Sequence, residues 1–149
     1  MRTNFLSSKL VRPRDKSFNS LVGFKDSTLF YEFFPYEYST ASKVEAEKLL
    51  SKSPTVVQVI RTHNIKSAPA SYFFEMLPAN NYVFLNVDVE GVDLQVLKSL
   101  DFRQNRPDLI CVEEWGLTEE GRSPIREFLM NFGYEFVNRT GLSNFYKKT

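Results

Sequence analysis

The stretch Tyr82-Val-Phe-Leu-Asn-Val-Asp-Val-Glu-Gly-Val-Asp93 decides how the rest of the chain is interpreted. Its first eight residues are apolar except at Asn86 and Asp88, and a valine-rich run of this length is typical of a strand buried on both faces of a parallel sheet. Because side chains alternate along a strand, we expect Asn86, Asp88 and Glu90 to point to one side, where the strand ends. Gly91 then permits a sharp turn.

A helix is predicted over residues 93–100, directly after this turn. In open α/β sheets, ligands bind just beyond the carboxyl ends of the strands, so Asp88 and Glu90 are candidate site residues. The alternative is that the two carboxylates cap the helix and bind the amide groups of the turn.

A second apolar run, residues 109–115, follows the predicted helix and also ends in carboxylates, Glu113 and Glu114. The order strand, helix, strand is the βαβ pattern of a parallel sheet, and its crossover is expected to be right-handed. Two neighbouring parallel strands would therefore deliver acids to the same edge of the sheet. Glu113 joins Asp88 and Glu90 as a candidate catalytic residue.

The last part of the chain predicts a helix and a hairpin. Ser123 is a good N-cap, with proline directly after it, and Gly133 is placed to end the helix. The runs 134–137 and 142–146 flank a four-residue loop, which favours an antiparallel hairpin.

Residues 1–17 carry five Lys or Arg against one Asp and are expected to be a leader or a truncated edge, with the domain itself over 18–149. The elements expected before the central stretch are a short strand over 20–24 and a strand over 28–34, as a hairpin or as successive strands, a helix over 42–50, a strand over 55–61 and a helical turn over 70–77.

Composition excludes several classes of protein. A net charge of +1 without a long basic run argues against a nucleic-acid partner. The single cysteine, Cys111, excludes an internal disulfide and fits a reducing compartment, and no apolar run reaches the ~18 residues of a membrane span. We therefore expect a cytoplasmic protein. His63 is the only histidine and has no Cys/His cluster around it in the sequence, so we predict no protein-built metal site.

These elements resemble the second half of the FkbM family of S-adenosylmethionine-dependent methyltransferases. The resemblance covers residues 80–146 and extends more loosely back to residue 20. The matching words are Leu85-Asn-Val-Asp-Val-Glu-Gly-Val-Asp93, Leu97-Lys-Ser-Leu100, Arg106-Pro-Asp-Leu-Ile-Cys-Val-Glu113, Ile125-Arg-Glu-Phe-Leu129, Gly133-Tyr134 and Asn144-Phe-Tyr146. The resemblance implies an α/β fold: a partial class I methyltransferase (Rossmann-like) sheet, mostly parallel, with an antiparallel C-terminal hairpin.

The chain departs from such enzymes at the cofactor. They hold S-adenosylmethionine on a glycine-rich loop after the first strand, whereas the only glycine before Gly91 here is Gly23. The expectation is that residues 18–149 form the C-terminal portion of the domain, which puts cofactor binding by this chain in doubt. A doubly wound sheet without its central first strand would expose an apolar edge, where the chain could self-associate.

The resemblance implies O-methylation of a hydroxyl on a small molecule such as a sugar or natural product. Asp88 would orient or deprotonate the acceptor, Glu90 and Glu113 would shape the acceptor side, and Trp115 could stack on a ring or pack in the core. The second hypothesis is a non-catalytic remnant that acts as a binding or oligomerisation module. The third is a glycosidase that uses Asp88 or Glu90 with Glu113, although barrel glycosidases of about 250 residues are far longer.

Overall fold

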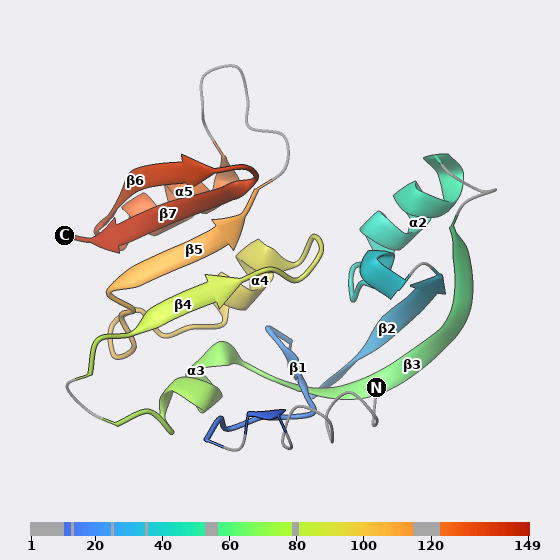
Figure 1. Cartoon of the computed structure of the whole chain (residues 1–149), viewed down its shortest axis with the longest axis horizontal. Coiled ribbons are helices and arrows are strands. Elements are labelled where there is room, and N and C mark those ends of the chain that lie inside the picture. The colour runs from blue at the N-terminus through green and yellow to red at the C-terminus, as the bar shows by residue number, and fades with distance from the viewer. Residues whose placement is uncertain are drawn as a thin grey trace.

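The computed structural model describes residues 11–12, 14–24, 26–34, 36–52, 57–78, 81–114 and 123–149. These residues form two sheets with helices packed around them (Figure 1). Most of the expected leader, and Trp115, lie outside the described residues. Among the described helices, none is long and apolar enough to cross a membrane.

The C-terminal sheet has the strand order β4-β5-β7-β6. Its strands are β4 (Phe84–Val87), β5 (Leu109–Glu113), β6 (Tyr134–Thr140) and β7 (Ser143–Lys148). β4 and β5 are parallel and are joined through helix α4 (Asp93–Lys98), which confirms the predicted βαβ unit. The fold is mixed α/β. The mostly parallel sheet is not confirmed, because β7 pairs antiparallel with both β5 and β6 among the described strands.

Helices α4 and α5 (Pro124–Met130) lie behind this sheet in Figure 1 and form the main core with it. Helix α5 begins as expected, since the Ser123 side chain accepts a hydrogen bond from the Arg126 backbone N–H at 2.9 Å. The completely buried side chains of this core are Leu97, Ile110, Val112, Leu129 and Tyr146.

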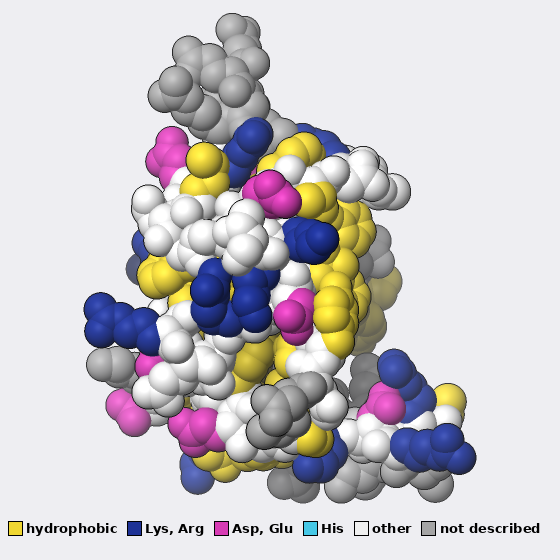
Figure 2. Space-filling model, turned by 90° about the vertical axis from the view of Figure 1, so that its left-hand side faces the viewer, with side chains coloured by type: hydrophobic (Ala, Val, Ile, Leu, Met, Phe, Trp, Pro, Cys, Tyr) yellow, Lys and Arg dark blue, Asp and Glu magenta, His cyan; other side chains and the backbone are white. Residues whose placement is uncertain are grey.

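The expectation that the central strand is buried on both faces is wrong. Leu85 and Val87 pack into the core, but Phe84 is 53% exposed and Asn86 is also exposed. The reason is the position of β4: it is the last described strand on its side of the sheet, and α4 and α5 cover only one face. Figure 2 shows hydrophobic side chains gathered along one flank of this part of the molecule.

The C-terminal hairpin is present, but its loop is shorter than predicted. β6 and β7 pair as far as Thr140 and Ser143, so only Gly141 and Leu142 lie between the strands, and Val137 forms a bulge. The expected four-residue loop over 138–141 is therefore mostly strand. β6 is an edge strand with exposed side chains after its first residue, and polar residues at such positions do not interrupt pairing.

The N-terminal unit contains β1 (Leu21–Val22), β2 (Ser27–Phe34) and β3 (Gln58–Ala68). β2 pairs antiparallel and β1 parallel with β3, so the two early strands are successive strands on either side of β3, not a hairpin. The remaining elements before β4 are η1 (Tyr36–Tyr38), α2 (Lys43–Lys52) and α3 (Ala70–Phe74).

β3 runs further than the strand expected over 55–61, of which residues 55–56 lie outside the described part of the chain. His63 lies on β3 with its Nε2 2.6 Å from Oε2 of Glu32, and this contact lowers the pKa of Glu32. A small second core, made of Phe33, Ala46 and Val57, holds α2 against β2.

Candidate acidic site at the strand ends

The structure brings the three predicted site residues together. Carboxylate oxygens of Asp88, Glu90 and Glu113 all lie within 4.8 Å of one another. We call these three residues the acid trio. They meet because β4 and β5 are parallel and are paired up to Val87 and Val112, so both strands end at the same edge of the sheet.

The charges of the acid trio act on one another. The pKa of Glu90 is raised, first by partial burial of its carboxyl group and then by the charges of Glu113, Asp88 and Asp93. A carboxyl group with a raised pKa is suited to exchange a proton with a ligand hydroxyl. Three neighbouring carboxylates could also hold a metal ion, so the expected absence of a metal site stays a prediction.

The turn between β4 and α4 has a left-handed backbone. Glu90 has φ +51° and Gly91 has φ +90°. The buried carboxyl group of Asp93 accepts hydrogen bonds from the backbone N–H of Val89 at 3.1 Å and of Gly91 at 3.2 Å. Burial raises the pKa of Asp93 in spite of these bonds.

These contacts argue against the alternative in which Asp88 and Glu90 cap helix α4 and bind the amide groups of the turn. The carboxylate that binds amides of the turn in the described structure is Asp93, and the N-cap residue of α4 is Val92, which has no side-chain cap bond. Sequence reasoning placed Asp93 at the helix start but missed this role.

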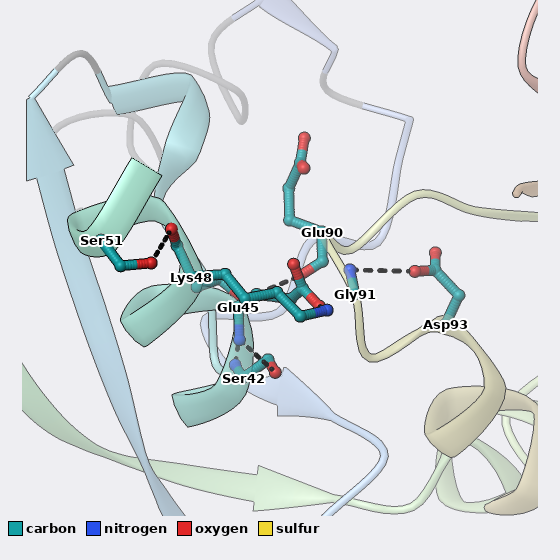
Figure 3. Close-up of polar contacts among 8 residues, drawn as sticks. Ser42, Glu45, Lys48, Ser51, Glu90, Gly91 and Asp93 are labelled. Carbon is teal, nitrogen blue, oxygen red and sulfur yellow. Dashed lines mark hydrogen bonds and ion pairs between the residues drawn. The ribbon is translucent and has the colours of Figure 1, made fainter. Parts of the chain in front are cut away.

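Helix α2 packs against the same turn (Figure 3). A Cβ atom added to Gly91 would lie 2.5 Å from Cγ of Glu45, so the backbone of the turn and the helix are in close contact. The Thr40 hydroxyl, just before the helix, donates a 2.7 Å hydrogen bond to the Glu90 carbonyl oxygen. No local pattern in the sequence indicates this contact, because the two residues are 50 positions apart.

A cavity of about 540 Å³ lies beside the acid trio. Its walls include Glu90 and Glu113 of the trio, Glu45 and Lys48 of α2, and Ile125 of α5. The Lys48 ammonium lies 2.6 Å from Oε1 of Glu45. A volume of this size is in the range of small-molecule sites, which run from about 300 to 1,000 Å³.

Glu114 follows Glu113 of the trio in the chain, and because successive side chains of a strand point to opposite faces, it lies apart from the trio. It is buried, and its Oε1 accepts a 2.8 Å hydrogen bond from the Tyr146 hydroxyl, while Oε2 has no hydrogen-bond partner in the described structure. Burial, and then Glu114, raise the pKa of Tyr146. Glu114 thus belongs to the core side of the sheet, although it also borders the cavity.

A βαβ unit with acids at the carboxyl ends of two parallel strands is a feature of α/β proteins, and in open α/β sheets ligands bind at this edge. The model of the Methyltransferase FkbM domain matches residues 7–136, most of the 149-residue chain. The chain therefore belongs to the FkbM methyltransferase family. The comparison with curated proteins found no match, and neither did the comparison with solved structures.

The family match confirms the resemblance seen in the sequence, and it gives no support to a glycosidase. Methyltransferases of this family use S-adenosylmethionine in general. The described glycines do not fit a loop for that cofactor. An added Cβ would meet Val96 at Gly23, Glu45 at Gly91 and Arg106 at Gly133, while the open position, Gly141, lies in the turn between β6 and β7.

Proposed function

We propose that this domain provides the acceptor side of an O-methyltransferase site. The ligand is a small molecule with several hydroxyl groups, and it binds in the cavity between α2 and the ends of β4 and β5. The observation that carries the proposal is the meeting of three carboxylates within 4.8 Å beside a cavity of about 540 Å³. Carboxylates accept hydrogen bonds from hydroxyl groups, and these bonds are stronger than those to neutral acceptors.

Each member of the acid trio has a role in this proposal. Asp88 orients the acceptor hydroxyl or takes its proton, while Glu90 and Glu113 accept hydrogen bonds from further hydroxyl groups of the same molecule. In the family, S-adenosylmethionine supplies the methyl group for an in-line transfer to the acceptor oxygen. Because the described glycines do not fit a loop for this cofactor, the proposal is confined to the acceptor side.

Calorimetric titration with a panel of sugars and polyols tests the proposal. We expect binding by the unaltered chain and a loss of affinity of about 10-fold or more in Asp88→Asn and Glu113→Gln, since each removes a charged acceptor. Glu75→Gln, an exposed glutamate on another part of the surface, is the matched control and should bind normally. Affinity that is unchanged in both trio variants would remove the acid trio from the site.

Titration with S-adenosylmethionine, read together with the acceptor titration, separates this proposal from the second candidate function, a non-catalytic oligomerisation module. Micromolar binding, followed by transfer of a labelled methyl group to a bound acceptor, would establish the complete reaction. A folded sample that self-associates and binds neither S-adenosylmethionine nor any sugar or polyol of the panel would favour the module. The observation behind that second candidate is the outer edge of β4, with which no described strand pairs, and the exposed Phe84 on the same strand.

A further inference from the structure

Thr40 connects the N-terminal unit to the acid trio. Its side chain is almost completely buried, with 1% exposed. The hydroxyl donates to the carbonyl oxygen of Glu90 at 2.7 Å and accepts from the backbone N–H of Ser42 at 2.9 Å. The Thr40 hydroxyl thus links residues 40–42, which precede α2, to the turn after β4.

Thr40 is itself held in place by its surroundings. Its backbone N–H donates to the Tyr31 carbonyl at 3.1 Å, and its own carbonyl accepts from the Tyr31 N–H at 2.8 Å. The next polar residue, Ser42, accepts from the Glu45 N–H at the start of α2. The hydroxyl of Thr40 is therefore presented from a fixed backbone, which is a requirement for a residue that positions another.

Glu90 needs such a constraint. A glutamate at φ +51° is in the left-handed region, which non-glycine residues enter only where their surroundings hold them. Asp93 binds the N–H groups of Val89 and Gly91, on either side of Glu90 in the chain. Thr40 binds the carbonyl of Glu90 itself, so the two side chains hold the turn through different groups.

We propose that Thr40 is a positioning residue whose hydroxyl fixes the Glu90 turn, so that the Glu90 carboxyl group stays beside Asp88 and Glu113. The role of the trio in acceptor binding rests on the function proposed above, whereas the effect of Thr40 on the conformation of the turn does not. Thr40, which precedes α2, thereby controls the geometry of a site whose acids all lie at the strand ends of the other sheet.

Two variants separate the hydroxyl from the bulk of the side chain. Thr40→Val keeps the volume and removes the hydroxyl, and Thr40→Ser keeps the hydroxyl. In amide NMR spectra we expect Thr40→Val to shift the resonances of Glu90 and Gly91, and Thr40→Ser to leave them near their original positions. Thr62→Val, which removes an exposed threonine hydroxyl from β3, is the control and should leave both resonances unchanged.

Acceptor binding supplies the second readout. Thr40→Val should weaken the binding of sugars or polyols by about 10-fold, and Thr40→Ser should restore it. If no such compound binds the unaltered chain, the proposed function fails, and the NMR comparison still decides the role of Thr40. Unshifted Glu90 and Gly91 resonances in a folded Thr40→Val sample, or a Thr40→Ser variant that behaves like Thr40→Val, would overturn the proposal.

A measurement on the unaltered chain covers the case in which Thr40→Val does not fold. A buried hydroxyl that donates to the Glu90 carbonyl should exchange its proton slowly with water and show a nuclear Overhauser contact to residues of the turn. A Thr40 hydroxyl proton that exchanges freely would contradict the hydrogen bond on which the proposal stands.

Discussion

Glu90 combines an unusual backbone with a perturbed carboxyl group, and both can be tested at the scale of single residues. Its raised pKa means that the folded state holds the proton more tightly than the unfolded state does. Proton binding by Glu90 therefore makes its full contribution to the free energy of unfolding at low pH. It is lost as the pH rises from the ordinary pKa of 4.5 through the raised pKa of the folded protein.

Glu90→Gln should remove this pH dependence. Relative to the unaltered chain, the variant should gain free energy of unfolding as the pH rises above 4.5, because it no longer places a charge in a partly buried position beside Glu113 and Asp88. Urea denaturation at a series of pH values measures the difference, with Glu75→Gln as the control. If the stability of Glu90→Gln relative to the unaltered chain fell as the pH rose, the carboxylates of the trio would not repel one another as described.

Substitutions at Gly91 and Gly141 distinguish the cost of backbone strain at positive φ from the cost of a steric clash with a neighbouring side chain. At Gly141, φ is +62° and no atom lies within 4 Å of an added Cβ, so Gly141→Ala should lower the free energy of unfolding by about 1 kcal/mol from backbone strain alone. Gly91→Ala should cost more, because its Cβ would also meet Cγ of Glu45 at 2.5 Å.

The double variant Gly91→Ala with Glu45→Ala tests this explanation. Removal of the Glu45 side chain beyond Cβ should return the cost to about that of Gly141→Ala. Chemical denaturation of the four proteins gives the comparison. If the double variant is no more stable than Gly91→Ala alone, contact with α2 is not the source of the extra cost.

At the scale of elements, β4 is the one whose environment differs most from expectation. Its residues favour a strand, and a strand formed, but burial depends on which neighbours lie beside it. No described strand pairs with the outer edge of β4, and the Phe84 ring is exposed on the same strand, so this edge can pair with another chain. We therefore predict weak self-association of the chain that depends on its concentration.

Phe84→Lys should abolish that self-association, since a charged side chain beside an open strand edge opposes pairing with another copy. Sedimentation velocity over a range of concentrations is the measurement. Tyr72→Lys, which replaces an exposed aromatic residue on α3, is the matched control and should associate like the unaltered chain. A chain that is monomeric at every concentration without the substitution would contradict the prediction.

Local signals in the sequence predicted the C-terminal half well. Apolar runs, the Ser123 cap and the Asp88-Val-Glu-Gly91 turn each lie within a few residues, and they gave the βαβ unit, the start of α5 and the acid trio. Long-range contacts were missed. The pairing of β1 with β3 joins Leu21 to Ser67, and Thr40 reaches Glu90 across the two sheets, so neither leaves a periodic pattern in the chain.

At the scale of the whole molecule, the described residues form two cores of different size. The larger one packs α4 and α5 on the C-terminal sheet, and the smaller one contains Phe33, Ala46 and Val57. Thr40 and the contact between Gly91 and Glu45 link the two parts around the acid trio. Stability of the smaller core should therefore affect the site, although no residue of that core belongs to the trio.

Two truncations of completely buried side chains test this coupling. Leu97→Ala in the larger core and Phe33→Ala in the smaller one should each lower the free energy of unfolding by about 2–5 kcal/mol if the two cores unfold together. Hydrogen exchange gives the regional readout. If Phe33→Ala increases exchange only in β2, β3 and α2, while α4 and β5 keep their protection, the cores unfold separately.

The strand order of the C-terminal sheet has a consequence for the newly made chain. β7 follows β6 in sequence but lies between β6 and β5, where it supplies the second partner of β5. While the ribosome is still translating residues 143–148, one side of β5 therefore lacks its pairing strand, and the buried Ile110 and Val112 lack the covering ring of Tyr146. Because Glu113 of the acid trio lies on β5, we expect the trio to reach its final geometry only after β7 has paired with β5.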